Sequence, residues 1–238
     1  MKLALIGYGK MGKAVEEIAL SRNHSIAAVI DTPGDWSLKS DLLKICDAAV
    51  EFTIPSVAVG NIMKCFEAGV PVVSGTTGWN ERYAEVKEYC LKMGGALLYA
   101  SNFSLGMNIF FEVNRKLANL MNPYPMYDVN IEEIHHTQKL DAPSGTAITL
   151  ANDIIANLER KTAWVNEPSE NPGDLVINSV RVGTVPGTHT VTYNSENDMV
   201  SIRHEAKSRR GLALGAILAA EFIAGKKGVF TMNDLLGI

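Results

Sequence analysis

The sequence predicts an α/β protein with two domains: a doubly wound parallel sheet, and a second α+β domain that carries a mixed sheet. Over the first hundred residues, short apolar runs alternate with segments of helical spacing, which favours parallel strands covered by helices on both faces. The first apolar run leads directly into a glycine-rich turn and a helix. Beyond about residue 175, three strand-like runs follow one another, which favours a mixed or antiparallel sheet.

Composition excludes several classes of protein. The 238 residues are 47% hydrophobic and 20% charged, as in ordinary globular proteins. A formal net charge of −4 provides no basic field for nucleic acid or an acidic membrane. No apolar run approaches the roughly 20 residues of a membrane helix, and no signal-peptide pattern is present. Cys46, Cys65 and Cys90 are widely spaced and are interpreted as thiols in a reducing compartment, so we expect a cytoplasmic protein.

A dinucleotide site is predicted at the end of the first strand. The apolar run Lys2–Ile6 is followed by Gly7-Tyr8-Gly9-Lys10-Met11-Gly12 and then by a helical segment. Strand, G-x-G-x-x-G and helix form the Rossmann-like context in which a tight turn accommodates a pyrophosphate. The plainer alternative is an ordinary turn between a strand and a helix. The expected cofactor contacts are Gly7, Tyr8, Gly9, Lys10, Met11 and Gly12.

The second predicted strand, from Ser25 to Ile30, ends in an acid. Asp31 lies 19 residues after Gly12, near the distance expected for a carboxylate that binds the cofactor ribose. Its charge would repel a 2′-phosphate, and Thr32 stands next to it where no arginine follows. We therefore expect NADH to be accepted at least as well as NADPH. Asp31 could instead cap a turn before Pro33-Gly34.

Three more apolar runs continue the first sheet, with helical segments between them. In such a sheet, ligands bind at the carboxyl ends of the strands. The runs are 48–53, 70–74 and 96–100, with helices expected at 57–68 and at about 81–93. The loops at their carboxyl ends are 52–55, 75–78 and 100–104.

The second half of the chain is predicted to change architecture. Helical spacing from Leu105 to Met121 is stopped by Asn122-Pro123, and the segment from Tyr127 to His136 is strand-like. The polar segment 162–174, with two prolines, is predicted as a loop. Further strands are expected at 175–182, 185–193 and 199–206, and helices at 211–224 and 230–236.

The stretch from His135 to Ala147 combines two imidazoles, an ammonium and the start of a helix. Pro143-Ser144-Gly145-Thr146 is typical of a helix N-terminus, with Ser144 as the cap or a first-turn residue. The free N–H groups and the dipole at a helix start suit a carboxylate or phosphate. Lys139 and the histidines add cationic or hydrogen-bonding groups. The stretch therefore predicts a site for a small anion with a proton donor within reach.

Plainer interpretations of this stretch remain open: a surface pair of histidines, and a simple helix cap. Strict alternation along a strand would send His135 and His136 to opposite faces, so both serve one site only if the strand ends there. A metal site is not expected, because the segment lacks His-x-x-x-His or Cys-x-x-Cys spacing. The lone strand histidines His189 and His204 are interpreted as structural.

Taken together, Glu133-Ile134-His135-His136, Lys139 and the segment from Asp141 to Ala147 resemble the signature of the dihydrodipicolinate reductase family. The resemblance implies that His135 donates a proton and that Lys139 assists it and binds substrate. It also implies that His136, Ser144, Gly145 and Thr146 hold the substrate carboxylates.

Other segments are similar to the same family. Gly183, Gly187 and His189 match its Arg-x-Gly…Gly-x-His segment. The loop 75–78 and the segment 100–103 resemble family segments that contact the nicotinamide and its ribose. The implied cofactor contacts there are Gly75, Thr76, Thr77, Ala100, Ser101, Asn102 and Phe103.

The resemblance implies an NAD(P)H-dependent oxidoreductase that reduces 4-hydroxy-tetrahydrodipicolinate (dihydrodipicolinate) to tetrahydrodipicolinate in lysine and diaminopimelate biosynthesis. It implies a dinucleotide-binding domain of residues 1–104 and 211–238, and a substrate-binding and oligomerisation domain of residues 105–210 that builds a homotetramer. Two alternatives are a redox sensor that binds dinucleotide without turnover and a dehydrogenase for another small amino or keto acid, because a fold alone does not define the reaction.

Overall fold

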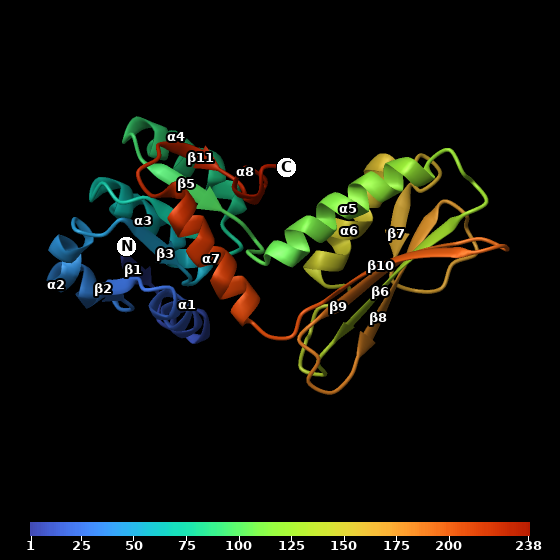
Figure 1. Ribbon diagram of the computed structural model, residues 1–238, viewed down its shortest axis with the longest axis horizontal. Helices are drawn as coiled ribbons and strands as arrows, with labels where there is room; N and C mark the ends of the chain where they lie inside the picture. The colour runs from blue at the N-terminus through green and yellow to red at the C-terminus, as the bar shows by residue number, and fades with distance from the viewer. The chain divides into compact units, whose positions relative to one another are not determined.

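The computed structural model describes residues 1–238, and the chain divides into two compact units (Figure 1). The first unit comprises Met1–Leu105 and Arg209–Ile238, and the second comprises Gly106–Ser208. Each unit contains one sheet and at least one hydrophobic core of its own. None of the helices has the combination of length and apolar character that crossing a membrane requires.

The first unit is built on a six-stranded sheet in the order β11-β5-β4-β3-β1-β2. Every neighbouring pair in this sheet is parallel, as the alternation of strands and helices predicts. Its elements are β1 (Lys2–Ile6), α1 (Lys10–Ser21), β2 (Ser25–Ile30), α2 (Pro33–Leu43), β3 (Ala48–Glu51), α3 (Pro55–Glu67), β4 (Val72–Ser74), η1 (Asn80–Arg82), α4 (Tyr83–Lys92), β5 (Ala96–Tyr99), α7 (Arg210–Ile223), β11 (Gly228–Phe230) and α8 (Met232–Leu236).

Helices cover both faces of this sheet, so the fold is doubly wound. Side chains alternate across a strand, and β1 shows the consequence: Leu3 and Leu5 belong to a core with α1, α7 and α8. Ala4 and Ile6 belong to a second core with α2, α3 and α4. The C-terminal helix α7 therefore completes a layer that begins with α1, and Arg22 at the end of α1 binds Glu221 of α7 through two hydrogen bonds of 2.8 Å.

The second unit carries a mixed five-stranded sheet in the order β10-β9-β6-β8-β7. The pairs β6–β8 and β7–β8 are parallel, whereas β6–β9 and β9–β10 are antiparallel. Both helices of the unit pack against one face of this sheet in a single core. The elements are α5 (Leu105–Met121), β6 (Asp128–His135), α6 (Gly145–Asn157), β7 (Ala163–Val165), β8 (Asp174–Arg181), β9 (Thr188–Asn194) and β10 (Met199–Glu205).

Three elements differ from those predicted. Helix α2 is not among the predicted helices, and a turn before Pro33-Gly34 was considered only as the alternative role of Asp31. The helix forms because Thr32 and Asp35 make a capping box and the proline stands in its first turn. The segment 162–174, predicted as a loop, contains β7, which pairs with β8 at the edge of the sheet. Phe230, expected in the terminal helix, ends β11, and α8 begins two residues later.

Candidate active site

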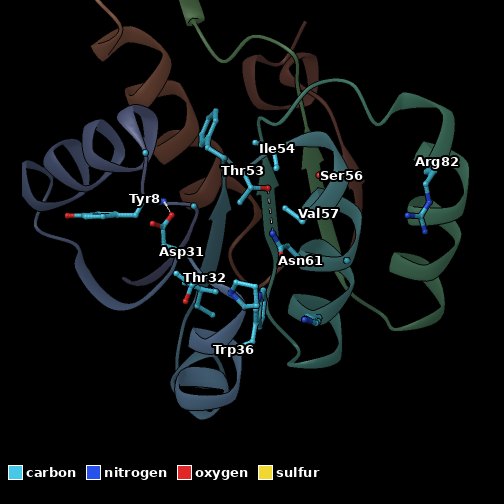
Figure 2. A pocket seen from close by; sticks show the side chains of 17 residues that line it. Tyr8, Asp31, Thr32, Trp36, Thr53, Ile54, Ser56, Val57, Asn61 and Arg82 are labelled. Carbon is cyan, nitrogen blue, oxygen red and sulfur yellow. Dashed lines mark hydrogen bonds between the residues drawn. The ribbon is translucent and has the colours of Figure 1, made fainter.

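A cavity of about 720 Å³ lies at the carboxyl edge of the first sheet. It is formed by residues that directly follow β1, β2 and β3, where ligands bind in doubly wound sheets. Figure 2 shows Asp31 and Trp36 on one side of it and Thr53 and Asn61 on the other. Of the predicted cofactor contacts, those lining the cavity are Gly7, Tyr8, Gly9 and Asp31.

The space around each glycine of the turn after β1 explains why a residue without a side chain stands there. Gly7 has φ +90°, and a Cβ there would lie 2.1 Å from the Phe52 carbonyl oxygen. A Cβ on Gly12 would lie 2.3 Å from the Gly7 carbonyl oxygen, so α1 packs directly against the turn. Gly9 is the N-cap of α1 and has open space where its Cβ would stand. Lys10 and Met11 follow as the first residues of the helix, whose N-terminus has room for a phosphate.

Asp31 faces the cavity and also holds the glycine turn. Its Oδ1 accepts a 2.7 Å hydrogen bond from the Tyr8 backbone N–H. The Tyr8 hydroxyl donates to Glu16, and Figure 2 shows the Tyr8 ring pointing away from Thr53 and Asn61. Asp31 is exposed, so its second carboxylate oxygen can accept from ribose hydroxyls.

The loop Gly75–Gly78 rests on a buried carboxylate. Glu51, the last residue of β3, is 0% exposed and accepts hydrogen bonds from Ser74 Oγ at 2.6 Å and Thr76 Oγ1 at 2.8 Å. Thr76 is buried and supports the loop, whereas Thr77 is exposed. Glu51 was not predicted as part of the site; a carboxylate inside the apolar run 48–53 was the available signal.

The segment Ala100–Phe103 follows β5 at the same edge of the sheet. Phe103 is 1% exposed, and its ring lies edge-to-face against Phe52 with centroids 6.0 Å apart. Its side chain therefore belongs to the core. Ser101 is exposed, and Asn102 Oδ1 accepts from the backbone N–H two residues further on. These residues and the Gly75–Gly78 loop do not line the 720 Å³ cavity.

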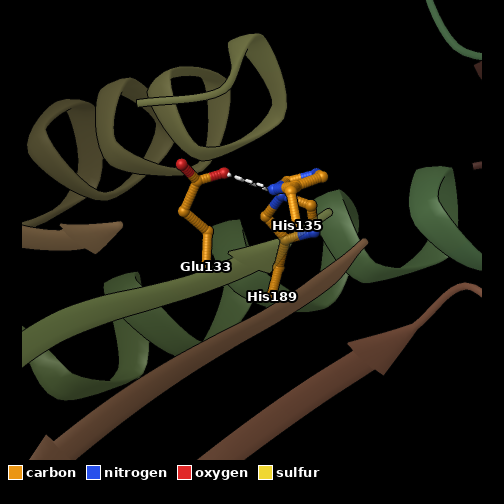
Figure 3. Close-up of side chains that lie close together, drawn as sticks. All are labelled: Glu133, His135 and His189. Carbon is orange, nitrogen blue, oxygen red and sulfur yellow. Dashed lines mark ion pairs between the residues drawn. The ribbon is translucent and has the colours of Figure 1, made fainter. Parts of the chain in front are cut away.

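In the second unit, the end of β6 places two titratable side chains on the covered face of the sheet. Glu133 and His135 are two residues apart and so point to the same side. Figure 3 shows them beside His189 of β9. His135 Nδ1 lies 2.9 Å from Glu133 Oε2, and the His135 and His189 ring centroids are 5.1 Å apart. Glu133 is 0% exposed and His135 is 8% exposed.

Burial and charge set the protonation of this cluster. Burial lowers the pKa of His135; Glu133 opposes this effect, and nearby cations add to it. Burial also lowers the pKa of His189, to about 4. For Glu133, burial alone would raise the pKa, but hydrogen bonds from Ser144 and Arg181 outweigh it and hold the value at about 2. Glu133 is therefore ionised and His189 neutral at neutral pH.

Helix α6 begins where the sequence predicts, with Ser144 as its N-cap. Ser144 Oγ accepts a 3.2 Å hydrogen bond from the Ala147 N–H, and the Ser144 N–H donates 3.1 Å to Glu133 Oε1. At the first two helical positions, the N–H groups of Gly145 and Thr146 have no partner inside the helix. The space where a Gly145 Cβ would stand is open. The helix start can therefore bind a carboxylate.

The segment between β6 and α6 carries the cation of the cluster. Lys139 Nζ lies 2.8 Å from both carboxylate oxygens of Asp141. Arg181 of β8 donates from Nη2 to the Asp141 carbonyl oxygen at 2.6 Å and to Glu133 Oε1 at 2.8 Å. Arg181 thus connects the segment of Lys139 and Asp141 to the buried Glu133 carboxylate. The same carboxylate is bonded to the start of α6 through the Ser144 N–H.

His136 follows the last residue of β6, so the alternation of the strand no longer constrains its side chain. It is partly buried, and its carbonyl oxygen accepts a 3.1 Å hydrogen bond from the Lys139 N–H. Its Nδ1 is buried without a hydrogen-bond partner. His136 therefore belongs to the turn that positions Lys139 and retains an unpaired ring nitrogen.

Sequence reasoning assigned no role to Glu133 or Arg181 and interpreted His189 as structural. His189 lies in the cluster, with Nε2 3.2 Å from Ser144 Oγ. The i, i+2 spacing of Glu133 and His135 was a signal in the sequence. For the other two the signal was the resemblance of their segment to the family's Arg-x-Gly…Gly-x-His motif. Their place beside β6 follows from strand register: Arg181 pairs with His135, and His189 with Glu133.

Comparison with known proteins gives a consistent family match across both units. A model described as the N-terminus of dihydrodipicolinate reductase matches residues 1–103, and one described as its C-terminus matches residues 106–236. The 4-hydroxy-tetrahydrodipicolinate reductase of Christiangramia forsetii is 49% identical over 99% of this chain and 98% of its own length. That of Thermosipho africanus is 33% identical over 99% of this chain and 98% of its own.

Solved structures agree in fold. The dipicolinate-bound dihydrodipicolinate reductase from Paenisporosarcina sp. TG-14 has a TM-score of 0.76 at 26% identity and covers 97% of both chains. An amine dehydrogenase from Mycobacterium smegmatis has a TM-score of 0.55 at 12% identity, covering 97% of this chain and 94% of its own, and shares the fold alone.

Proposed function

The chain belongs to the dihydrodipicolinate reductase family, and from this premise we propose how its residues divide the work of the reaction. The protein is an NAD(P)H-dependent oxidoreductase that reduces 4-hydroxy-tetrahydrodipicolinate to tetrahydrodipicolinate in lysine and diaminopimelate biosynthesis. The observation that carries the division is that a proton donor, an ammonium and an open helix start form one cluster in the second unit, while the dinucleotide turn lies in the first.

The first unit, with the edge of its sheet, binds the dinucleotide. The fit rests on the cavity and on the turn after β1, where Gly9 leaves the helix N-terminus open and Gly7 permits the bend. The bound cofactor supplies the hydride. Asp31 accepts hydrogen bonds from the ribose, and the loops that follow β4 and β5 hold the nicotinamide end. The proposed contacts in those loops are Gly75, Thr76, Thr77, Ala100, Ser101, Asn102 and Phe103.

The second unit binds the diacid substrate. The N–H groups of Gly145 and Thr146 and the Ser144 cap receive one carboxylate at the positive end of α6. His136 and the Lys139 ammonium bind the remaining negative charge. Because Lys139 already holds the Asp141 carboxylate in a bidentate pair, a substrate carboxylate replaces an interaction of the same type.

His135 donates the proton. The 4-hydroxyl leaves as water, which gives the unsaturated ring. Addition of a hydride to that ring leaves a negative charge on the substrate that a proton must neutralise, and an imidazole has a pKa suited to this task. The buried position of His135 favours its neutral form in the free protein. A bound dianion acts in the opposite direction and raises the pKa of the imidazole, so substrate binding itself charges the donor.

We infer that the protein accepts NADH at least as well as NADPH. Asp31 stands at the end of β2 and lines the cavity, and its carboxylate would face a 2′-phosphate. Thr32, which follows it, forms the capping box of α2 with Asp35 and adds no positive charge. Lys64 lines the same cavity and lies over the Trp36 ring, 4.8 Å from its centroid. Measurement of the KM values for NADH and NADPH decides whether the negative charge of Asp31 or the positive charge of Lys64 has the larger effect.

We propose assembly through the second sheet into a homotetramer in the cytoplasm. Both helices of the second unit pack on one face of this sheet. On the other face, Ile134, Val176 and Val180 are only partly buried, which suits a partner subunit. The three cysteines are free, as expected in a reducing compartment.

The decisive experiment follows NADH and NADPH oxidation with the freshly formed condensation product that is the substrate. We expect turnover with that diacid and little with other amino or keto acids. Cofactor binding without turnover would favour a redox sensor. Faster turnover of an amino or keto acid would favour another dehydrogenase.

A further inference from the structure

We propose that Glu133 is the positioning residue for His135: its buried carboxylate keeps a proton on Nδ1 and leaves Nε2 as the nitrogen that exchanges a proton with the substrate. This inference rests on the proposed role of His135 as donor. Glu133 touches neither substrate nor cofactor in this scheme and acts through the imidazole alone.

The contact between the two side chains is direct. His135 Nδ1 lies 2.9 Å from Glu133 Oε2, and Figure 3 shows the ion pair between them. The two atoms are close enough for a strong electrostatic interaction but are not aligned as a hydrogen bond. An ionised carboxylate only accepts hydrogen bonds, and a neutral imidazole has one nitrogen that donates and one that accepts. A proton on Nδ1 therefore gives an attractive contact, whereas a lone pair there would face a negative charge in a buried site. The pair selects one tautomer.

The other carboxylate oxygen keeps Glu133 charged and fixed. Oε1 accepts 2.8 Å from Arg181 Nη2 and 3.1 Å from the Ser144 N–H. These donors come from β8 and from the N-cap of α6, so the carboxylate is held from two elements besides its own strand. A buried carboxylate with such partners remains ionised through the neutral range, so Glu133 orients and stabilises the charged imidazole without donating a proton itself.

The opposite nitrogen of the ring lies close to Gly187. A Cβ on Gly187 would lie 3.0 Å from His135 Nε2 and 3.3 Å from Cδ2. Any side chain at Gly187 would crowd the nitrogen assigned to proton transfer. The ring thus has a carboxylate beside one nitrogen and, beside the other, a residue without a side chain.

A metal site is an alternative for this cluster, because Glu133, His135 and His189 offer ligand atoms within 4.8 Å of one another. The Arg181 guanidinium, however, is already bound to this carboxylate. A divalent cation would sit beside that positive charge. The charge pattern therefore favours orientation of an imidazole.

The charged groups around the His135 imidazole influence its pKa and therefore the pH profile that tests the proposal. They come from the strand of His135, from the segment that follows it and from the two neighbouring strands. The groups are Glu133 on β6, Lys139 and Asp141 after it, Arg181 on β8, and His189 on β9 with His204 behind it.

The first test compares Glu133→Gln with wild type. We expect kcat to fall about 10- to 100-fold, KM for the substrate to change less than about threefold, and the basic limb of the kcat–pH profile to move to lower pH. The limb moves because loss of the carboxylate removes a charge that favours the imidazolium. Glu133→Asp keeps the charge and should return the limb towards its wild-type position.

Glu132→Gln is the matched control. Glu132 is the preceding residue of β6, points to the other face and lies 3.5 Å from Asn178 Nδ2. This variant should retain wild-type kcat and pH profile. A Glu133→Gln enzyme with an unchanged profile and kcat would overturn the proposal.

A measurement on the unmodified protein covers the case in which Glu133→Gln does not fold. Nitrogen-15 NMR of the labelled imidazoles, with His135 identified by loss of its signals in His135→Gln, should show Nδ1 protonated in the neutral ring. An Nε2–H tautomer would contradict the inference. Activity lost to a chelator and restored by zinc would also contradict it. Absence of turnover in wild type, by contrast, would remove the proposed function and leave the tautomer result to stand separately.

Discussion

Lys139 Nζ lies 2.8 Å from each carboxylate oxygen of Asp141 and so forms a bidentate ion pair between β6 and α6. The Asp141 side chain is 60% exposed, and pairs of this kind contribute about 1 kcal/mol or less to stability. A doubly charged substrate can therefore exchange with Asp141 at small cost. The pair holds the ammonium within the segment that leads from β6 to α6.

Replacing this ammonium should impair the reaction. We expect Lys139→Ala to lower kcat/KM by about 10² or more, because both substrate binding and the assistance to His135 are lost. Initial rates over a range of substrate concentrations measure the effect. Lys116→Ala removes an exposed ammonium of the second unit, one paired with Glu112, and serves as the control. Similar rates in the two variants would contradict the role of Lys139.

Removing the donor imidazole should affect turnover but not the cofactor. We expect His135→Gln to reduce kcat by about 10² or more while leaving NADH affinity unchanged, because the dinucleotide turn belongs to the other unit. Stopped-assay rates and fluorescence titration with NADH give the two quantities. His204→Gln, which alters the β10 imidazole behind His189, should keep normal turnover. A fully active His135→Gln would exclude this donor.

Cofactor preference should respond to a single charge. Asp31→Asn removes the charge but retains an oxygen that can accept from the Tyr8 N–H. We expect KM for NADPH to fall about tenfold relative to KM for NADH, which corresponds to about 1.4 kcal/mol of repulsion. Asp41→Asn, at an exposed residue paired with Lys44, is the control. An unchanged ratio of the two KM values would show that Asp31 does not set the preference.

The free energy of unfolding should decrease as the pH is lowered, because of His189. Its pKa is about 4 in the folded protein against 6.5 when unfolded, so the stabilising effect of the neutral ring is complete above pH 6.5 and is lost as pH falls towards 4. Between pH 7 and pH 5 this difference costs about 2 kcal/mol. Urea unfolding at both pH values should show a correspondingly weaker pH dependence in His189→Gln, whose neutral amide can still reach Ser144. The same loss of stability between pH 7 and pH 5 in wild type and His189→Gln would contradict the argument that burial of His189 causes the pH dependence.

Much of the fold follows from local patterns that the sequence displays directly. The apolar runs and glycine turn predict the parallel sheet, and helical spacing predicts α5 between the residues where it is found. The prediction of Ser144 as cap or first-turn residue includes its observed position as N-cap, because that preference depends on the residue itself and its neighbours. The helix α2 was missed although Thr32 and Asp35 carry a capping pattern, because the Pro33-Gly34 pair also fits a turn.

The sequence by itself therefore determined most of the strands and helices in their order, the glycine turn after β1 and the residues between His135 and Thr146 that suit an anion and a proton. Only the tertiary structure decided what lies around His135. The register of β8 and β9 against β6 brings Arg181 beside the last residue of the strand and His189 beside Glu133. Register depends on pairing between distant segments, and a shift of one residue would turn every side chain to the other face, so no local pattern could reveal it.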